Sequence, residues 1–200
     1  MILVGYPPSV FTRSARLGLH LCGLRHGLEE FDPFDGSEGP HPFGRVPILR
    51  DGGLSIYETQ AILTYLDRLS GGILMPDDPI SAAREMQVAS IASAYAYWPL
   101  VRQVYAARVF GPANGEAPDE ARVAEGLAAA PQVLDALEDI AAEGHALTGP
   151  HLGGLILAPM LDAFSQDRDG ARLLQDRPAL HAWLDGIRAH DCWEGTATWP

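Results

Sequence analysis

The sequence contains no lysine, and its fourteen basic residues, all arginine, face twenty-six acidic ones. The resulting formal net charge of −12 argues against a broad basic surface. Nucleic acids and anionic membranes bind proteins that cluster positive charge, so neither is expected as a partner. The excess of acid is typical of a soluble protein whose copies repel one another.

Cysteine is scarce as well, since only Cys22 and Cys192 occur, in unrelated contexts. Such a pair provides neither a disulfide framework nor a CxxC redox motif. No uncharged apolar run reaches the length of about 18 residues that a membrane span needs. The opening residues, MILVGYPPSV, lack the basic leader and small-residue cleavage site of a secretory signal. These absences predict a cytoplasmic protein in a reducing compartment.

Motifs for metal or nucleotide chemistry are missing too. The seven histidines form no pair at the helical spacing of metal ligands, so no metal site is predicted. The chain also contains neither a GxGxxG motif nor a P-loop. The chemistry must therefore come from other groups.

The first seventy residues alternate between strand-like and helix-like patterns. In chain order they predict a strand, a helix, a strand, a hairpin and a helix, at residues 2–4, 13–24, 29–34, 46–49 with 54–56, and 59–69. This order is typical of a small α/β domain.

The character of the chain changes after residue 70. Residues 71–80 have the glycine and proline density of a linker. Beyond them, Ala/Leu-rich segments have helical periodicity without strand signals, at residues 81–110, 119–143, 152–166 and 178–190. We therefore predict an α/β domain at residues 1–70, a linker at 71–80 and an all-helical domain at 81–200.

Two motifs carry a family resemblance, one at the start of the hairpin and one directly after it. They read GRVPIL at residues 44–49 and YETQAI at residues 57–62. Together with GYPPSVFTRSARLGL at residues 5–19, they resemble the glutathione transferase family, in particular its bacterial-type, theta- and zeta-like members. The resemblance implies an α/β thioredoxin-like N-terminal domain that binds glutathione as co-substrate, and an all-α C-terminal helical domain that shapes the second pocket.

The resemblance also implies how glutathione is held. In the family's pattern the Val46–Pro47 bond is cis and presents the Val46 backbone to the cysteinyl part of glutathione. Glu58 and Thr59 open a helix, whose free amides and dipole favour the γ-glutamyl carboxylate. Glu58 suits the ammonium group at the same end. Arg45 offers a forked donor to carboxylate or backbone groups.

The chemistry requires a thiolate, and a free thiol of pKa about 8.5 is mostly protonated at neutral pH. Alignment with serine-dependent members implies that Ser9 supplies the activating hydroxyl. Tyr6 lies nearby and remains the alternative donor, while the plain structural alternative for Ser9 is a turn or helix N-cap. No cysteine lies in this turn, which disfavours cysteine-dependent chemistry.

The second substrate is expected between the domains. A small hydrophobic electrophile would lie in a pocket walled by Phe11, Tyr97, Arg102 and Tyr105. The apolar surplus on residues 83–110 exceeds what one internal face needs, and the resemblance also implies a homodimer.

The sequence departs from the family's pattern in two places. Before His41 only GSEGP intervenes, which cannot form the family's usual second helix. That region normally helps to hold the glycyl carboxylate of glutathione, so His41 or Arg45 is expected to substitute. At the start of the core helix near residue 152, the family's Ser/Thr and Asp capping box reads His151 and Gly154 here. The sequence does not identify the replacement cap.

The predicted activity is conjugation of the glutathione thiolate to small electrophiles. A zeta-like maleyl isomerase is an alternative, weakened because the Ser-Ser-Cys triplet of that class is replaced by Ser9, Val10 and Phe11. A non-catalytic binding or assembly module is the alternative from another class, and the missing second helix favours it.

Overall fold

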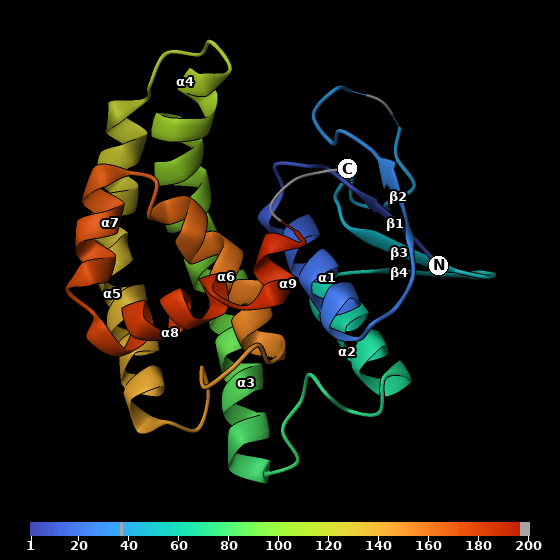
Figure 1. Ribbon diagram of the computed structural model, residues 1–200. Helices are drawn as coiled ribbons and strands as arrows, with labels where there is room; N and C mark the ends of the chain where they lie inside the picture. The colour runs from blue at the N-terminus through green and yellow to red at the C-terminus, as the bar shows by residue number, and fades with distance from the viewer. Residues whose placement is uncertain (37, 197–200) are drawn as a thin grey trace.

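The computed structural model describes residues 1–36 and 38–196. A four-stranded sheet with two helices forms the N-terminal part, and a bundle of helices forms the remainder (Figure 1). The predicted fold class, a thioredoxin-like α/β part followed by an all-α part, is confirmed. The exact boundaries of the domains remain a prediction.

The sheet is mixed, with the strand order β2-β1-β3-β4. The strands span Ile2–Gly5 (β1), Gly27–Glu30 (β2), Ile48–Asp51 (β3) and Leu54–Tyr57 (β4). Strand β1 runs parallel to β2 and antiparallel to β3, with Val4 opposite Ile48. Strands β3 and β4 form the predicted hairpin, and Gly52 in its turn has φ +57°, which glycine adopts without steric cost.

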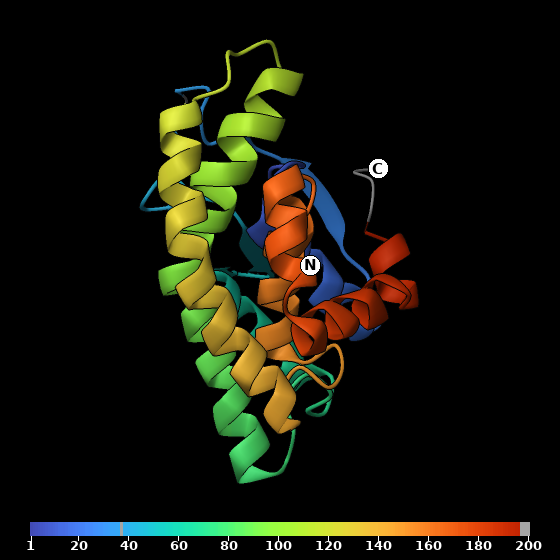
Figure 2. The same ribbon diagram turned by 90° about the vertical axis from the view of Figure 1, so that its left-hand side faces the viewer.

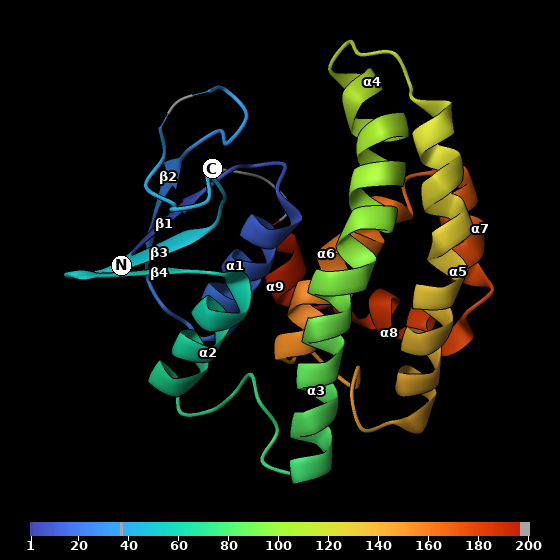
Figure 3. The same ribbon diagram turned by 180° about the vertical axis from the view of Figure 1, so that it is seen from behind.

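Helices α1 (Val10–Leu21) and α2 (Thr59–Leu69) lie between the sheet and the helical bundle (Figures 1 and 3). Helix α2 has the predicted bounds. The predicted range 13–24 for the first helix was wrong by three residues at each end. Helix α1 starts earlier because Ser9 is its N-cap and accepts a hydrogen bond from the Thr12 N–H at 3.2 Å.

The helical part is built around one buried helix. Its elements are α3 (Pro79–Ile91), the π-type helix η1 (Ala92–Phe110), α4 (Gly111–Ala113), α5 (Glu120–Glu143), α6 (Leu152–Phe164), α7 (Arg168–Gln175), α8 (Pro178–Arg188) and α9 (Asp191–Glu194). Helix α3 runs into η1, which packs beside α5 (Figure 2). Helix α6 packs against α1, α3 and η1 and is buried on nearly every face, as its continuous apolar sequence requires.

A buried carboxylate ties the linker to the sheet domain's last helix. One oxygen of Asp67 accepts hydrogen bonds from the Leu74 N–H at 2.8 Å and the Met75 N–H at 3.0 Å. The Leu152 N–H in turn donates to the Leu74 carbonyl at 2.8 Å. The linker is thereby held to α2 at one end and to the start of α6 at the other.

The cap that α6 lacks locally is supplied by α3. Glu85 is fully buried, and one of its oxygens accepts from the Gly153 N–H at 2.9 Å and the Gly154 N–H at 3.3 Å. The other oxygen accepts from the Leu147 N–H at 3.2 Å. Burial raises the pKa of Glu85, while the three N–H donors and the nearby His151 act in the opposite direction. Glu85 thus satisfies backbone donors at the helix start, where the family's capping box would otherwise act.

Glycine makes this arrangement sterically possible. A Cβ atom at Gly153 would lie 2.2 Å from the Glu85 carbonyl oxygen, so only glycine lets α3 approach this closely. A Cβ atom at Gly154 would lie 2.7 Å from Cζ2 of Trp183. The Trp183 ring therefore occupies the space that the family's aspartate would need.

The segment between β2 and β3 contains no helix within residues 31–36 and 38–47, as predicted. Turns and bends lead the chain directly past the end of the sheet. Among the helices that the structure describes, none combines the length and apolarity needed to cross a bilayer.

Candidate active site

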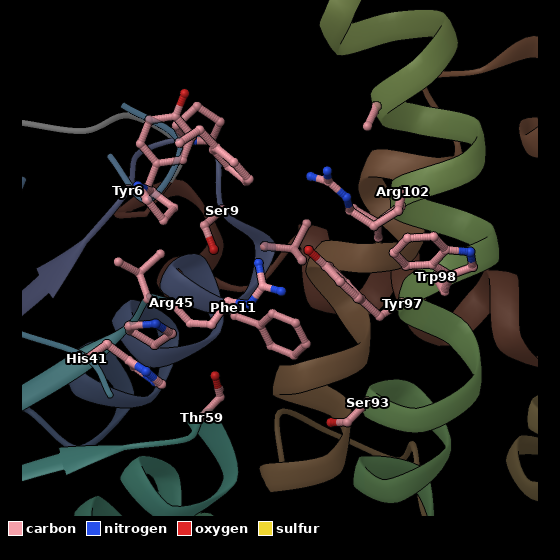
Figure 4. A pocket seen from close by; sticks show the side chains of 18 of the residues that line it. Tyr6, Ser9, Phe11, His41, Arg45, Thr59, Ser93, Tyr97, Trp98 and Arg102 are labelled. Carbon is pink, nitrogen blue, oxygen red and sulfur yellow. The ribbon is translucent and has the colours of Figure 1, made fainter. Parts of the chain in front are cut away.

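A cavity of about 890 Å³ lies between the α/β part and η1, and every predicted site residue lines it. The α/β part contributes Ser9, Phe11, His41, Arg45, Val46, Pro47, Glu58 and Thr59. Helix η1 contributes Tyr97, Arg102 and Tyr105. Figure 4 shows the polar groups of the first set on one wall and the η1 side chains on the other. The structure therefore brings together residues that are distant in the sequence.

Ser9 lies where the chain leaves β1 and enters α1. Its N–H donates to the Tyr6 carbonyl at 2.9 Å, and its Oγ accepts from the Thr12 N–H at 3.2 Å. A hydroxyl has one donor and two acceptor positions, so capping uses the oxygen and leaves the hydrogen available. Ser9 is therefore the N-cap of α1, as the structural alternative predicted. Capping leaves its hydroxyl hydrogen able to donate to a ligand in the cavity.

Tyr6 lines the same cavity and packs edge-on against Phe34, with ring centroids 6.0 Å apart. Burial raises the pKa of Tyr6, and the carboxylates of Asp32 and Glu30 raise it further. Both effects disfavour negative charge at this position. A thiolate is therefore less favourable beside Tyr6 than beside Ser9.

The start of α2 provides backbone donors to the cavity. Thr59 is the first helical residue and is only 7% exposed. No side chain caps this end of the helix, so the first-turn amides remain available to an anion. Glu58 precedes it with φ 71°, a conformation that costs a non-glycine residue of order 1–3 kcal/mol. Such strain is common where a backbone is shaped around a ligand.

His41 lies deep in the cavity wall despite the missing helix. Its side chain is 2% exposed, and its Nδ1 accepts from the Phe43 N–H at 3.1 Å. The hydrogen of the neutral ring is therefore on Nε2, which lies 3.9 Å from Glu58 Oε1. Burial lowers the pKa of His41, Glu58 opposes this, and Arg45 lowers it again. His41 thus offers a neutral N–H donor beside the exposed Arg45.

The Val46–Pro47 peptide bond is cis, as the resemblance implied. Both residues line the cavity and precede β3, so they lie outside the ladder that joins β3 to β1. The Val46 backbone therefore lies just before the interior strand β3, outside its ladders, and it lines the same cavity as Ser9.

The opposite wall is largely aromatic. The rings of Phe11 and Tyr97 lie 4.9 Å apart between centroids, which joins the two parts of the chain across the cavity. The sequence-based prediction lacked four further aromatic wall residues, Phe34, Phe43, Trp98 and Phe110. Trp98 and Phe110 belong to the same aromatic-rich helix, which was a usable signal. Phe34 was assigned to a strand, but β2 ends four residues before it.

The donor set of the cavity suits an anionic organic ligand. Hydroxyl, amide, imidazole and guanidinium groups supply hydrogen-bond donors, and the aromatic rings supply apolar surface. Within residues 1–36 and 38–196, no group of three His, Cys, Asp or Glu side chains is placed to hold a metal ion.

Comparison with known proteins identifies relatives along most of the chain. The family described as "Glutathione S-transferase, N-terminal domain" matches residues 3–73. Glutathione S-transferase hmp2 of Hypomyces subiculosus is 31% identical over 160 residues, which are 76% of this chain and 74% of that protein. Glutathione S-transferase F14 of Arabidopsis thaliana is 29% identical over 160 residues, again 76% of this chain. The match spans 63% of that relative, less than two thirds of its length.

The fold is also shared with solved structures. Glutathione transferase F7 from Populus trichocarpa superposes with a TM-score of 0.84 at 22% identity. The superposition covers 98% of this chain and 97% of that chain. At this level of identity the likeness concerns the fold alone. The sequence relatives include plant phi-class proteins, whereas a theta- or zeta-like type was predicted.

Proposed function

Because this chain belongs to the glutathione S-transferase family, we propose that it conjugates the thiolate of glutathione to small hydrophobic electrophiles. One observation carries the proposal. A single cavity joins the Ser9 hydroxyl, the uncapped start of α2 and an aromatic wall from η1. This arrangement supports the proposal, because glutathione at the start of α2 and an electrophile against η1 could both reach the Ser9 hydroxyl.

In this proposal glutathione lies along the wall formed by the α/β part. The first-turn amides of α2 and the Thr59 hydroxyl hold the γ-glutamyl carboxylate, and Glu58 accepts from the ammonium group. The Val46 backbone pairs with the cysteinyl residue like an added strand. His41 Nε2–H and Arg45 hold the glycyl carboxylate, where the family's second helix would otherwise contribute.

The sulfur then lies near Ser9, whose hydroxyl hydrogen donates to it. This donation stabilises the thiolate relative to the thiol and lowers the pKa of the bound thiol. The thiolate attacks the electrophile, a carbon–sulfur bond forms, and the leaving group departs with its electron pair. The theta- or zeta-like, serine-dependent subtype is proposed only from the position of Ser9 in the cavity. The plant phi-class relatives do not support that subtype.

The test pairs a calorimetric titration of glutathione with conjugation of 1-chloro-2,4-dinitrobenzene. We expect saturable binding and turnover above the uncatalysed rate. Binding without turnover of this or other electrophiles would favour the non-catalytic module. Isomerisation of a maleyl substrate without net glutathione consumption would favour the zeta-like alternative.

Replacing Thr59 with alanine should weaken glutathione binding by about 1–2 kcal/mol, because a typical hydrogen bond contributes about 0.5–1.5 kcal/mol and one to a charged group about 1.5–3 kcal/mol. The contact is remote from sulfur and exists equally in the ground and transition states. The Michaelis constant for glutathione should therefore rise about five- to thirtyfold, with turnover at saturation nearly unchanged. Steady-state kinetics with glutathione varied at fixed electrophile measures both quantities.

Two variants control the Thr59 experiment. Thr59→Ser keeps the hydroxyl and should be close to neutral. Thr64→Ala lies on the same helix but removes an exposed hydroxyl that donates to the Gln60 carbonyl, so it should leave the Michaelis constant unchanged. An unchanged constant in Thr59→Ala would mean that the start of α2 does not hold glutathione.

We further propose that the protein is a homodimer. Large apolar side chains remain exposed on α3 and η1, with Tyr95 at 65%, Trp98 at 55% and Met86 at 36% exposure. Light scattering should give twice the chain mass of 21.5 kDa. Tyr95→Glu should shift the mass toward the monomer, whereas Ile73→Glu, at an exposed site in the linker, should not. A wild-type mass of one chain would contradict the proposal.

A further inference from the structure

Arg45 and Arg102 are the two arginines that line this cavity, and neither pairs with a carboxylate within the described residues. Arg45 is assigned to glutathione on the α/β wall, which leaves Arg102 on η1 as the cavity arginine without an assigned ligand. In the part of the chain that the structure describes, Arg102 makes no hydrogen bond or ion pair. Its guanidinium carbon lies over the Phe34 ring, 5.4 Å from the ring centroid. Several other buried or half-buried arginines are paired with acids, as in Arg13–Asp162, Arg108–Asp167, Arg177–Asp135 and Arg188–Asp162. In a chain with twenty-six acidic residues, an unpaired guanidinium facing a cavity calls for a ligand-based explanation.

The position of Arg102 separates it from the groups assigned to glutathione. Figure 4 shows its guanidinium extending from η1 into the cavity, opposite the wall that carries His41, Arg45 and Thr59. The Tyr97 hydroxyl reaches into the same space. Within residues 1–36 and 38–196 this hydroxyl has no hydrogen-bond partner. Donors on this wall therefore face the second substrate rather than the peptide.

The surroundings of Arg102 define the chemistry of that substrate. Phe11 and Tyr97 provide flat apolar surface, and Arg102 provides a planar fork that matches a carboxylate. We propose that the preferred electrophile is an aromatic or otherwise apolar molecule bearing a carboxylate, which Arg102 binds while the reacting carbon lies toward Ser9. This inference rests on the proposed function and adds the class of the second substrate.

Two chloronitrobenzenes of similar shape test the proposal, one with a carboxylate and one with a neutral carboxamide at the same ring position. The probes are 4-chloro-3-nitrobenzoate and 4-chloro-3-nitrobenzamide. In both, the thiolate forms a carbon–sulfur bond, the carbon–chlorine bond breaks, chloride leaves with the electron pair, and the thiol proton passes to solvent. Each enzymatic rate is divided by the uncatalysed rate with glutathione, which removes the difference in intrinsic reactivity.

We expect the wild type to favour the benzoate, by kcat/KM, about tenfold or more after this correction. Arg102→Gln should lose about ten- to hundredfold with the benzoate, the range for losing a charge-assisted hydrogen bond, and stay within about threefold with the benzamide. Arg102→Lys should be intermediate, since it keeps the charge and loses the fork. Arg68→Gln removes the same charge from an arginine whose side chain is 78% exposed, and should change neither rate.

Three results would overturn the proposal: no preference for the benzoate, equal losses with both probes in Arg102→Gln, or a rise of tenfold in the Michaelis constant for glutathione in that variant. If the wild type conjugates neither probe, the transferase proposal is still decided separately by 1-chloro-2,4-dinitrobenzene, which is the more reactive electrophile. Calorimetric titration of 4-chloro-3-nitrobenzoate into wild type and Arg102→Gln then decides the matter. Binding at least about tenfold tighter in the wild type supports the anion site, and equal binding refutes it.

Discussion

Replacing Glu85 with alanine is expected to lower the free energy of unfolding by about 3–5 kcal/mol. The carboxylate accepts from three backbone N–H groups, two at the start of α6 and one at Leu147. Alanine has no acceptor, and each buried donor left unsatisfied costs about 1–3 kcal/mol. Since a domain is typically stable by only about 5–15 kcal/mol, this loss should be visible in urea or thermal unfolding.

Matched variants separate the cap from a general effect of truncation. Glu85→Gln keeps one acceptor oxygen of similar shape and should cost less than alanine. Glu143→Ala removes an acid that pairs with Arg84 at the surface of the same helical part, and should cost no more than about 1 kcal/mol. If Glu85→Ala were as stable as Glu143→Ala, the carboxylate would not be the cap of α6.

The raised pKa of Glu85 gives the prediction a pH dependence. Burial makes the folded state hold a proton on this carboxyl at a higher pH than the unfolded state does. The folded state therefore loses stability relative to Glu85→Gln as the pH rises from the ordinary range of glutamate through the raised pKa. The stability advantage of Glu85 over glutamine should be largest at acid pH and smaller at neutral pH.

Much of the fold could be predicted because local pattern and tertiary structure agree. The bounds of α2 follow from its apolar stripe, and the hairpin follows from the glycine pair at Gly52 and Gly53. The start of α1 was misplaced because the three residues after Ser9 have no helical periodicity, whereas the cap sets the start. Helices α7 and α9 were missed because they span only Arg168–Gln175 and Asp191–Glu194.

The replacement cap was not predicted because it is a contact between α3 and α6. A signal was present, since Glu85 falls on the same stripe as the buried Val88, Ala89 and Ala92. An acid on the buried face of a helix requires a partner, and here the partners are backbone amides. The sequence could indicate that Glu85 needs donors, but only the packing of Gly153 against α3 identifies them.

The site residues were predicted together because the resemblance places them at fixed points of one fold. All of them line one cavity, although their roles remain predictions. The sequence alone could not predict that negative charge is less favourable beside Tyr6 than beside Ser9. It depends on Asp32 and Glu30 lying near Tyr6 in space.

Replacing Ser9 with alanine is expected to reduce conjugation about ten- to hundredfold. The hydroxyl is proposed to donate to the thiolate, and a hydrogen bond to a charged group contributes about 1.5–3 kcal/mol. Each 1.36 kcal/mol corresponds to about a tenfold change in rate. The pKa of bound glutathione, followed by the ultraviolet absorbance of the thiolate, should rise in parallel. Glutathione binding at low pH, where the thiol is neutral, should change little.

Because Ser9 also caps α1, its replacement should cost about 1 kcal/mol of stability in addition to activity. Asp78→Ala provides the matched control, since Asp78 caps α3 by accepting from the Ser81 N–H at 2.8 Å and does not line the cavity. That variant should lose comparable stability and keep its activity and thiol pKa. Tyr6→Phe should also keep both, because the carboxylates near Tyr6 disfavour a thiolate there. Full activity in Ser9→Ala, combined with a loss in Tyr6→Phe, would reverse the assignment and make the phenol the activating donor.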